Sequence, residues 1–323
     1  MRSILFLGYS NLVKNRILPI VAKAGFTRIA IAKYAGQPWD DAWQSSPVPV
    51  TRYDDYETGL DAFSGEWVYV STVNSSHVAC ARASLARGFH TIIDKPATES
   101  FSEALDLVTL ARSKRRFLGE STVYLCHPQL SAIRQVFDRF GDTPKLLTVH
   151  FTMPPFQPDN FRYQRGLGGG AIMDTAPYAV SVGRYFFGTK PVSVTCEVTE
   201  RREDGLDIEY SLLMTYPGGR ALIGHFGFNT EYMNQLQLLG TRTNVTVNRI
   251  YTIPDTLRNT LFVRHLNQES ELTVEPGNSF LLYLAQVLHE AGAADYEASY
   301  RDLLLDAEVR EMIMKQAEIK QYG

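Results

Sequence analysis

The sequence has little excess charge, no basic tract and few cysteines, and each of these absences excludes a class of protein. The 32 Lys and Arg residues nearly balance the 35 Asp and Glu residues, which leaves a formal net charge of −3. Proteins that bind nucleic acid or an anionic membrane surface usually carry a concentrated positive patch, and the sequence has no stretch of this kind. We therefore expect neither nucleic acid nor a membrane as a partner.

The three cysteines are Cys80, Cys126 and Cys196, and they lie far apart in the sequence. Their odd number and wide spacing match neither a disulfide framework nor a metal site, so we expect buried thiols and no bound metal. The first apolar run, Ile4–Gly8, is too short for a signal peptide, and no later run is long enough to cross a bilayer. These features predict a cytoplasmic protein in a reducing compartment.

The chain is long enough for two domains, and 45% of its 323 residues are hydrophobic. In the first third, short apolar runs typical of buried strands alternate with segments of helical character. This alternation predicts a doubly wound parallel sheet, a Rossmann domain over residues 1–123. The expected strands are Ile4–Leu7, Arg28–Ala32, Trp67–Thr72, Thr91–Asp94 and Phe117–Gly119, and the expected helices are Arg16–Lys23, Val78–Arg87 and Ser102–Arg112.

After about residue 125 the pattern changes to strands without helices between them. Residues 124–323 are expected to form an α+β domain with a large, mostly antiparallel open sheet, which binds substrate and mediates oligomerisation. The expected strands are Lys145–Thr152, Ile208–Tyr216, Ala221–Phe228, Leu236–Leu239, Asn244–Tyr251 and Leu261–His265. The expected helices are Gly170–Phe187, Phe280–Ala291 and Tyr296–Gln316.

The turn after the first strand occupies the place of a dinucleotide-binding turn. It consists of Gly8, Ser10, Asn11 and Leu12 with their neighbours, and it keeps only the first glycine of the G-x-G-x-x-G pattern. After the second strand, Lys33 is a cation suited to the 2′-phosphate of NADP, and we expect no acid to compete for it. The alternatives are an ordinary strand-to-helix turn and a solvated surface lysine.

Three segments form a more specific pattern when taken together: Thr72-Val73-Asn74-Ser75-Ser76-His77, then Asp94-Lys95-Pro96, then Gly168-Gly169-Gly170 leading to Asp174 and Tyr178. They resemble the Thr-Pro-Asn-x-x-His, Glu-Lys-Pro and Gly-Gly-Gly-x-x-x-Asp-x-x-x-His/Tyr motifs of the glucose–fructose oxidoreductase / inositol dehydrogenase / MocA family. That resemblance covers nearly the whole chain. It implies a Rossmann domain joined to an α/β domain with an open sheet, and an NAD(P)(H) cofactor.

The resemblance also implies residue roles. Thr72, Asn74, His77, Asp94 and Lys95 are expected at the cofactor, although His77 also fits a structural role at the start of a helix. The sequence departs from the family pattern where Val73 replaces proline and Asp94 replaces glutamate. Tyr178 stands where many members carry histidine, and this is similar to the branch that holds glucose–fructose oxidoreductase, dihydrodiol dehydrogenase and some nucleotide-sugar ketoreductases. The opening Gly8-Tyr9-Ser10 with Asn15-Arg16-Ile17-Leu18-Pro19 also resembles the nucleotide-sugar 3-dehydrogenases and 3-ketoreductases.

The chemistry can also be argued from the residues themselves. A tyrosine is a weak base near neutrality because its pKa is near 10, and a nearby ammonium group lowers that pKa. Lys95 and Tyr178 are therefore the expected catalytic pair. Asp174 lies one helical turn before Tyr178, where it could orient Lys95 or bind a sugar hydroxyl. Taken singly, a surface lysine, a solvated Asp/Tyr pair and a core tyrosine are the alternatives.

The segment Asn160–Arg165 precedes the three glycines and carries further candidates for substrate binding. Arg162 and Arg165 could contact a phosphate or a carboxylate, and Tyr163 lies between them. The alternative for both arginines is a solvated loop cation.

These observations and the family resemblance predict an NAD(P)-dependent oxidoreductase that interconverts a hydroxyl and a ketone on a sugar. The resemblance at the amino end implies that the reaction is at C3 of a nucleotide-activated sugar, such as a UDP-N-acetylhexosamine or a TDP-sugar. Lys33 favours NADP, and NAD stays open. One alternative is a dehydrogenase of free sugars, polyols or dihydrodiols, and another is a non-catalytic regulator that senses the dinucleotide. The apolar alternation over Ile208–Tyr216 fits either packing within the chain or contact with a second copy. We expect a homo-oligomer, a dimer or a tetramer.

Overall fold

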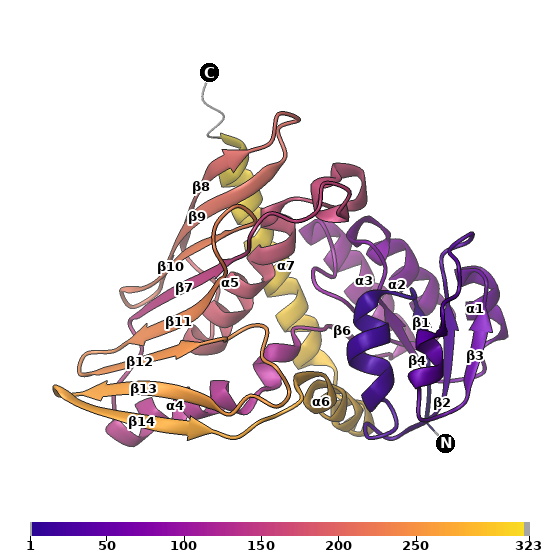
Figure 1. Ribbon diagram of the computed structural model, residues 1–323, viewed down its shortest axis with the longest axis horizontal. Coiled ribbons are helices and arrows are strands. Elements are labelled where there is room, and N and C mark those ends of the chain that lie inside the picture. Colours follow the sequence, from indigo (N-terminus) through magenta and orange to yellow (C-terminus); the bar gives the residue numbers. More distant parts are fainter. Residues whose placement is uncertain (1, 320–323) are drawn as a thin grey trace. The chain divides into compact units, whose positions relative to one another are not determined.

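The computed structural model describes residues 2–319 and divides the chain into two compact units (Figure 1). The first unit comprises Met1–Ser121 and Phe280–Ala307, and the second comprises Thr122–Ser279 and Glu308–Gly323. The segment Phe280–Ala307 packs with the first unit, whereas the expected domain ranges 1–123 and 124–323 assign it to the other part of the chain. The chain first leaves the first unit after Ser121, directly beyond the last strand of that unit.

The first unit is built on a six-stranded sheet in the order β3-β2-β1-β4-β5-β6. Every neighbouring pair is parallel, so the predicted doubly wound parallel sheet is confirmed. The direction of strand order reverses between β1 and β4, which is where ligands bind in sheets of this type. The strands are β1 (Arg2–Leu7), β2 (Phe26–Ala32), β3 (Val50–Tyr53), β4 (Trp67–Val70), β5 (His90–Ile93) and β6 (Leu118–Glu120).

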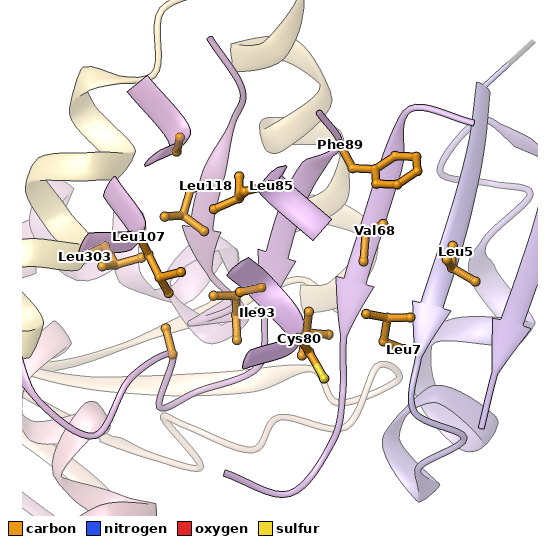
Figure 2. Packing of buried hydrophobic residues seen from close by; sticks show 14 of the residues in the cluster. Leu5, Leu7, Val68, Cys80, Leu85, Phe89, Ile93, Leu107, Leu118 and Leu303 are labelled. Atoms are coloured by element: carbon orange, nitrogen blue, oxygen red, sulfur yellow. The ribbon is translucent and has the colours of Figure 1, made fainter. Parts of the chain in front are cut away.

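Helices between the strands cover the sheet because their apolar side chains and those of the strands bury one another. Figure 2 shows this core, in which Leu5, Val68, Ile93 and Leu118 from four strands meet side chains from the helices. Helix α3 begins with a capping box, in which Ser100 and Glu103 each bond the other's backbone N–H. The helices of this unit are α1 (Tyr56–Ala62), α2 (His77–Ala86), α3 (Phe101–Lys114), α6 (Ser279–Ala293) and the first part of α7 (Glu297–Ile319).

The second unit is built on an eight-stranded sheet in the order β14-β13-β12-β11-β7-β10-β9-β8. Only β7 and β10 run parallel, and every other pair in this sheet is antiparallel, which confirms the predicted mostly antiparallel sheet. The strands are β7 (Leu146–Thr152), β8 (Ser193–Arg201), β9 (Asp207–Tyr216), β10 (Arg220–Gly227), β11 (Met233–Leu239), β12 (Thr243–Asn248), β13 (Asn259–His265) and β14 (Gln268–Val274).

Two helices of the second unit pack on one face of this sheet. Helix α5 (Ala171–Phe187) lies against β7, β9 and β10, and α4 (Pro128–Phe140) lies against β12, β13 and β14. Along β9, alternate residues from Ile208 to Tyr216 are buried on the helix-covered face. Of the two explanations for that alternation, packing within the chain is therefore the correct one.

Some elements differ from the expectation. The helical stretch after β1 covers residues 11–20, rather than Arg16–Lys23, and continues as a π-helix (Val13–Ile17) and a 3-10 helix (Leu18–Ile20) that contains Pro19. Strands β3, β8 and β14 and helices α1 and α4 were not predicted. Strand β3 is short, and β8 and β14 are largely exposed, so these strands give a weak hydrophobic signal. Within residues 2–319, no helix is both long and apolar enough to cross a bilayer.

Candidate functional site

The carboxyl ends of the strands in the first unit place the predicted cofactor residues in one row. Backbone bonds extend each parallel pair by one residue beyond the strand: Gly8 to Ala32, Ser71 to Leu7, Asp94 to Val70 and Ser121 to Ile93. Lys33, at the end of β2, donates its backbone N–H to Tyr53 in the same way. Lys33, Gly8, Ser71, Asp94 and Ser121 thus occupy successive strand ends along one edge of the sheet, where nucleotides bind in such folds.

Gly8 is required at its position for two reasons. Its φ is +109°, and a Cβ there would lie 2.1 Å from the carbonyl oxygen of Ser71. The chain then turns at Ser10, whose Oγ accepts a hydrogen bond from the backbone N–H of Val13 at 3.1 Å. Asn11 is exposed and Leu12 is half-buried at the start of the helical stretch. A turn with only one of the three fingerprint glycines therefore still forms a tight strand-to-helix connection.

Asp94 is the centre of a hydrogen-bond network of side chains. Its Oδ1 accepts from the hydroxyls of Tyr69 at 2.7 Å and Ser121 at 3.1 Å, and its Oδ2 accepts from Ser71. Ser71 in turn shares a hydrogen bond of 2.8 Å with Ser10. Burial, followed by the nearby Asp94 charge, raises the pKa of Tyr69 well above its ordinary value, so Tyr69 donates as a neutral phenol. The network connects the turn after β1 to the segment that carries Lys95.

Lys95 follows directly and is half-buried, and its peptide bond to Pro96 is cis. The buried ring of His77 lies beneath this segment, with Nδ1 2.8 Å from the carbonyl oxygen of Pro96 and Nε2 3.2 Å from that of Thr72. His77 therefore ties the β4–α2 connection to the Lys95 segment, which supports its structural role. Asn74 is buried and Thr72 half-buried in the same connection.

Lys33 is not a free cation, and the expectation that no acid competes for it is wrong. Its Nζ lies 3.0 Å from Oδ1 of Asp54, the residue that follows β3. Strand β3 pairs with β2 so that Ala32 lies opposite Tyr53, and this register places the next residues of both strands together. Asp54 was missed because 21 positions separate it from Lys33 in the sequence.

A second contact network fastens the turn after β1 to the loop after β2. The hydroxyl of buried Tyr9 donates to the carboxylate of Asp40 and accepts from the backbone N–H of Trp43 at 2.8 Å. Lys14 pairs with the same carboxylate at 2.6 Å. The site residues present thus suit a dinucleotide: a tight glycine turn at the switch point, hydroxyls beside it, and Lys33 at the end of β2.

In the second unit, Asp174 and Arg162 form an ion pair. Arg162 Nε lies 2.9 Å from Oδ2 of Asp174, and the Asp174 side chain is only 8% exposed. Arg162 also packs against the rings of Phe156 and Phe161. The structure therefore brings together two residues that were predicted for the substrate, and Arg162 is not a solvated loop cation.

The start of α5 is held by a residue that the sequence did not indicate. Asp207 Oδ2 accepts from the backbone N–H of Ile172 at 2.7 Å. Gly170 has a φ of +113°, and a Cβ there would lie 2.8 Å from Oδ1 of the same carboxylate. Asp207 therefore fixes the geometry of the glycine segment from which Asp174 and Tyr178 continue.

Tyr178 lies in a cluster of aromatic rings. Its ring centroid is 4.8 Å from that of Tyr251, 4.9 Å from Phe151 and 5.8 Å from Tyr124. Tyr124 also bonds Ser181 on the same helix at 2.7 Å. Packing thus fixes the position of the Tyr178 ring. Nothing in the sequence pointed to Tyr251.

The two other residues predicted for the substrate have different settings. Tyr163 is half-buried, and its hydroxyl accepts from the backbone N–H of Phe156 at 2.9 Å. Arg165 is exposed. The predicted catalytic residues are divided between the units, with Lys95 in the first and Asp174 and Tyr178 in the second.

Comparison with known protein families finds matches in both parts of the chain. An oxidoreductase family with an NAD-binding Rossmann fold matches residues 2–121, and the GFO/IDH/MocA C-terminal domain matches residues 138–246. Among characterised relatives, a dTDP-3,4-didehydro-2,6-dideoxy-alpha-D-glucose 3-reductase of Streptomyces antibioticus is 30% identical over 201 residues. That match covers 62% of this chain and 61% of the relative.

Solved structures share the fold over nearly the whole chain. A 3-ketoreductase from Actinomadura kijaniata, in complex with NADP and TDP-benzene, is 22% identical and covers 98% of both chains with a TM-score of 0.89. A UDP-N-acetylglucosamine 3-dehydrogenase from Acidithiobacillus ferrooxidans is 16% identical and covers 98% of both chains with a TM-score of 0.80. The predicted fold, oxidoreductase class and nicotinamide cofactor are confirmed, and the chain belongs to the Gfo/Idh/MocA family of oxidoreductases.

Proposed function

We propose that this protein interconverts a hydroxyl and a ketone at C3 of a nucleotide-activated sugar, with NAD(P)(H) as its cofactor. The observation that carries the proposal is the similarity to the Streptomyces reductase of a dTDP-sugar, at 30% identity. The two solved nucleotide-sugar 3-oxidoreductases support it through their common fold. The resemblance of Gly8-Tyr9-Ser10 with Asn15-Arg16-Ile17-Leu18-Pro19 to the nucleotide-sugar enzymes supports the same substrate class.

Each unit contributes groups suited to one part of this chemistry. The dinucleotide, when bound, supplies or accepts the hydride. The residues proposed to hold it are Gly8, Ser10, Asn11, Leu12, Lys33, Thr72, Asn74, His77, Asp94 and Lys95. For Asp94 and His77 the proposed role is to hold neighbouring segments of the cofactor site in place. Both ring nitrogens of His77 and both carboxylate oxygens of Asp94 already have protein partners.

Tyr178, from the second unit, is the proposed acid and base for the sugar oxygen. Lys95, from the first unit, is proposed to bind that oxygen and to favour the phenolate. The aromatic rings around Tyr178 hold it in one orientation. Asp174 and Arg162 are proposed to bind sugar hydroxyls and phosphate as a pair, with Tyr163 and Arg165 beside them. Their ion pair orients both side chains before substrate binds.

Two substitutions test the catalytic roles. Tyr178→Phe should lower kcat by about 100-fold or more, because it removes the group proposed to exchange the proton. Lys95→Ala should lower kcat by about the same factor, because it removes the cation proposed to stabilise the phenolate. Turnover is measured from reduced-nicotinamide absorbance with UDP-, TDP- and GDP-sugars, the matching 3-keto sugars and the free sugars. Tyr185→Phe, a half-buried tyrosine later on the same helix, is the matched control.

The outcomes separate the alternatives. Turnover with free sugars or dihydrodiols but not with nucleotide sugars would replace the proposed substrate class. Dinucleotide binding without turnover of any substrate would make the protein a sensor. Rates close to those of the unmodified enzyme in both variants would exclude the catalytic pair.

A homo-oligomer is also proposed, formed through the face of the eight-stranded sheet opposite α5 and α4. Leu213, Ile223 and Phe262 lie on this face and are 41%, 46% and 46% exposed. Leu213 lies directly opposite Ile223 in the β9–β10 pair. Exposed apolar side chains on a sheet face are typical of an interface. Ile223→Glu should shift the sedimentation coefficient toward that of a monomer, whereas an unmodified protein that sediments as a monomer would contradict the proposal.

A further inference from the structure

The ends of β2 and β3 carry a charged cluster in which only Lys33 has a role in the proposed function. Asp54 accepts a hydrogen bond from Trp39 Nε1 at 2.9 Å and pairs with Lys33 Nζ at 3.0 Å. These two bonds, the indole first, hold the pKa of Asp54 below its usual range. The guanidinium of Arg52 lies 5.3 Å from the ring centroid of Trp39 and 4.3 Å from that of Trp43. One carboxylate thus faces an ammonium and an indole N–H, with a guanidinium nearby.

The two partners of the ion pair differ in exposure. The Lys33 side chain is only 8% exposed, whereas that of Asp54 is 80% exposed. A nearly buried ammonium needs an anion beside it, because an unpaired buried charge is costly. An exposed carboxylate can leave at little cost, since water solvates it. The cluster is therefore built so that another anion can replace Asp54 at Lys33.

The position of the cluster indicates which anion this is. The carboxyl end of the second strand is where the adenosine ribose of a dinucleotide lies in a doubly wound sheet. NADP differs from NAD only by a phosphate on that ribose. We propose that Asp54 is a specificity-determining residue, which competes with the 2′-phosphate of NADP(H) for Lys33 and so weakens NADP(H) binding without weakening NAD(H) binding.

The test is the affinity of the free protein for NADPH and for NADH, measured by titration of nicotinamide fluorescence. Asp54→Asn keeps an acceptor for the Trp39 indole and removes the charge. It should tighten NADPH binding by about threefold to tenfold and change NADH binding by less than about twofold. The expected gain is the repulsion between one carboxylate and a phosphate dianion a few ångströms away at a solvent-exposed surface. Asp106→Asn, an exposed carboxylate paired with Arg82, is the matched control and should change neither affinity.

A second substitution makes the competition itself measurable. Lys33→Gln removes the group for which the two anions compete, so it should weaken NADPH binding more than NADH binding. In the Lys33→Gln background, Asp54→Asn should lose most of its effect on NADPH. Thermal unfolding verifies that Lys33→Gln is folded. If it is not, Arg52→Gln replaces it and should weaken NADPH binding selectively.

Three results would overturn the inference: equal changes for NADPH and NADH in Asp54→Asn, a selective loss of NADH binding, or an unmodified protein that binds neither dinucleotide. A selective loss of NADH binding would instead assign Asp54 to the ribose hydroxyls. The inference rests on the nicotinamide cofactor of the proposed function and on no other part of it. Because no sugar is present, these outcomes are independent of which substrate the enzyme turns over.

Discussion

The two units hold Lys95 and Tyr178, the proposed catalytic pair, by different means. In the first, a connected set of hydroxyls and one carboxylate, from Ser10 through Ser71 to Asp94, links the dinucleotide turn to the Lys95 segment. In the second, the rings of Phe151 and Tyr251 position Tyr178. Hydrogen bonds fix direction and are costly to leave unmade, whereas aromatic rings are held by the shape and the preferred geometry of their packing. The comparison predicts that single polar substitutions disrupt the first arrangement more than the second.

The largest effect on stability is expected for Asp94→Ala. This change leaves the hydroxyls of Tyr69, Ser71 and Ser121 without their common acceptor. Hydrogen bonds to a charged group are among the strongest in proteins, so urea unfolding of the purified protein should show a loss of about 3 kcal/mol. Because the network reaches Ser10, dinucleotide affinity should fall as well.

The control for Asp94→Ala is Asp106→Ala, which removes an exposed carboxylate from α3 and should change stability by less than about 0.5 kcal/mol. If Asp94→Ala behaved like this control, the network would not be what positions the Lys95 segment. If stability fell but dinucleotide affinity did not, the network would serve the fold alone.

The sequence was sufficient to predict Gly8, Lys33 and Asp94 at strand ends of the first unit, but it did not indicate a role for Ser71 or Ser121. Apolar runs that end at Gly8, Ser71 and Asp94 indicate parallel strands, and parallel strands bring their carboxyl ends to one edge of the sheet. It was not sufficient for Asp54, because the short and mostly exposed strand β3 carries no hydrophobic signal. The pairing of β2 with β3 that brings Asp54 to Lys33 depends on an irregular loop of the intervening chain.

The second unit was predicted in part. The i,i+4 spacing predicted that Asp174 and Tyr178 lie on the same side of one helix. It did not predict which residues contact either of them. Arg162 had been expected to contact substrate, and its pairing with Asp174 follows from the path of two short 3-10 helices, Phe161–Tyr163 and Arg165–Leu167. Tyr251 lies 73 positions after Tyr178, and a contact of that separation between aromatic rings leaves no local pattern in a single sequence.

The smallest effect, and the one of opposite sign, is expected at Tyr251. Among residues 2–319 its hydroxyl has no hydrogen-bond partner, although the side chain is buried. Burial, followed by the neighbouring hydroxyls of Tyr124, Tyr210 and Tyr178, raises the pKa of Tyr251 well above its ordinary value, so it is a neutral phenol. An unsatisfied buried hydroxyl destabilises the folded state, so Tyr251→Phe should raise the free energy of unfolding by about 1 kcal/mol.

Tyr124→Phe is the matched control, and because it removes a hydrogen bond to Ser181 it should lower that free energy by about the same amount. A loss of stability in Tyr251→Phe would show that its hydroxyl takes part in polar contacts within the aromatic cluster, and the second unit would then rely on the same kind of network as the first.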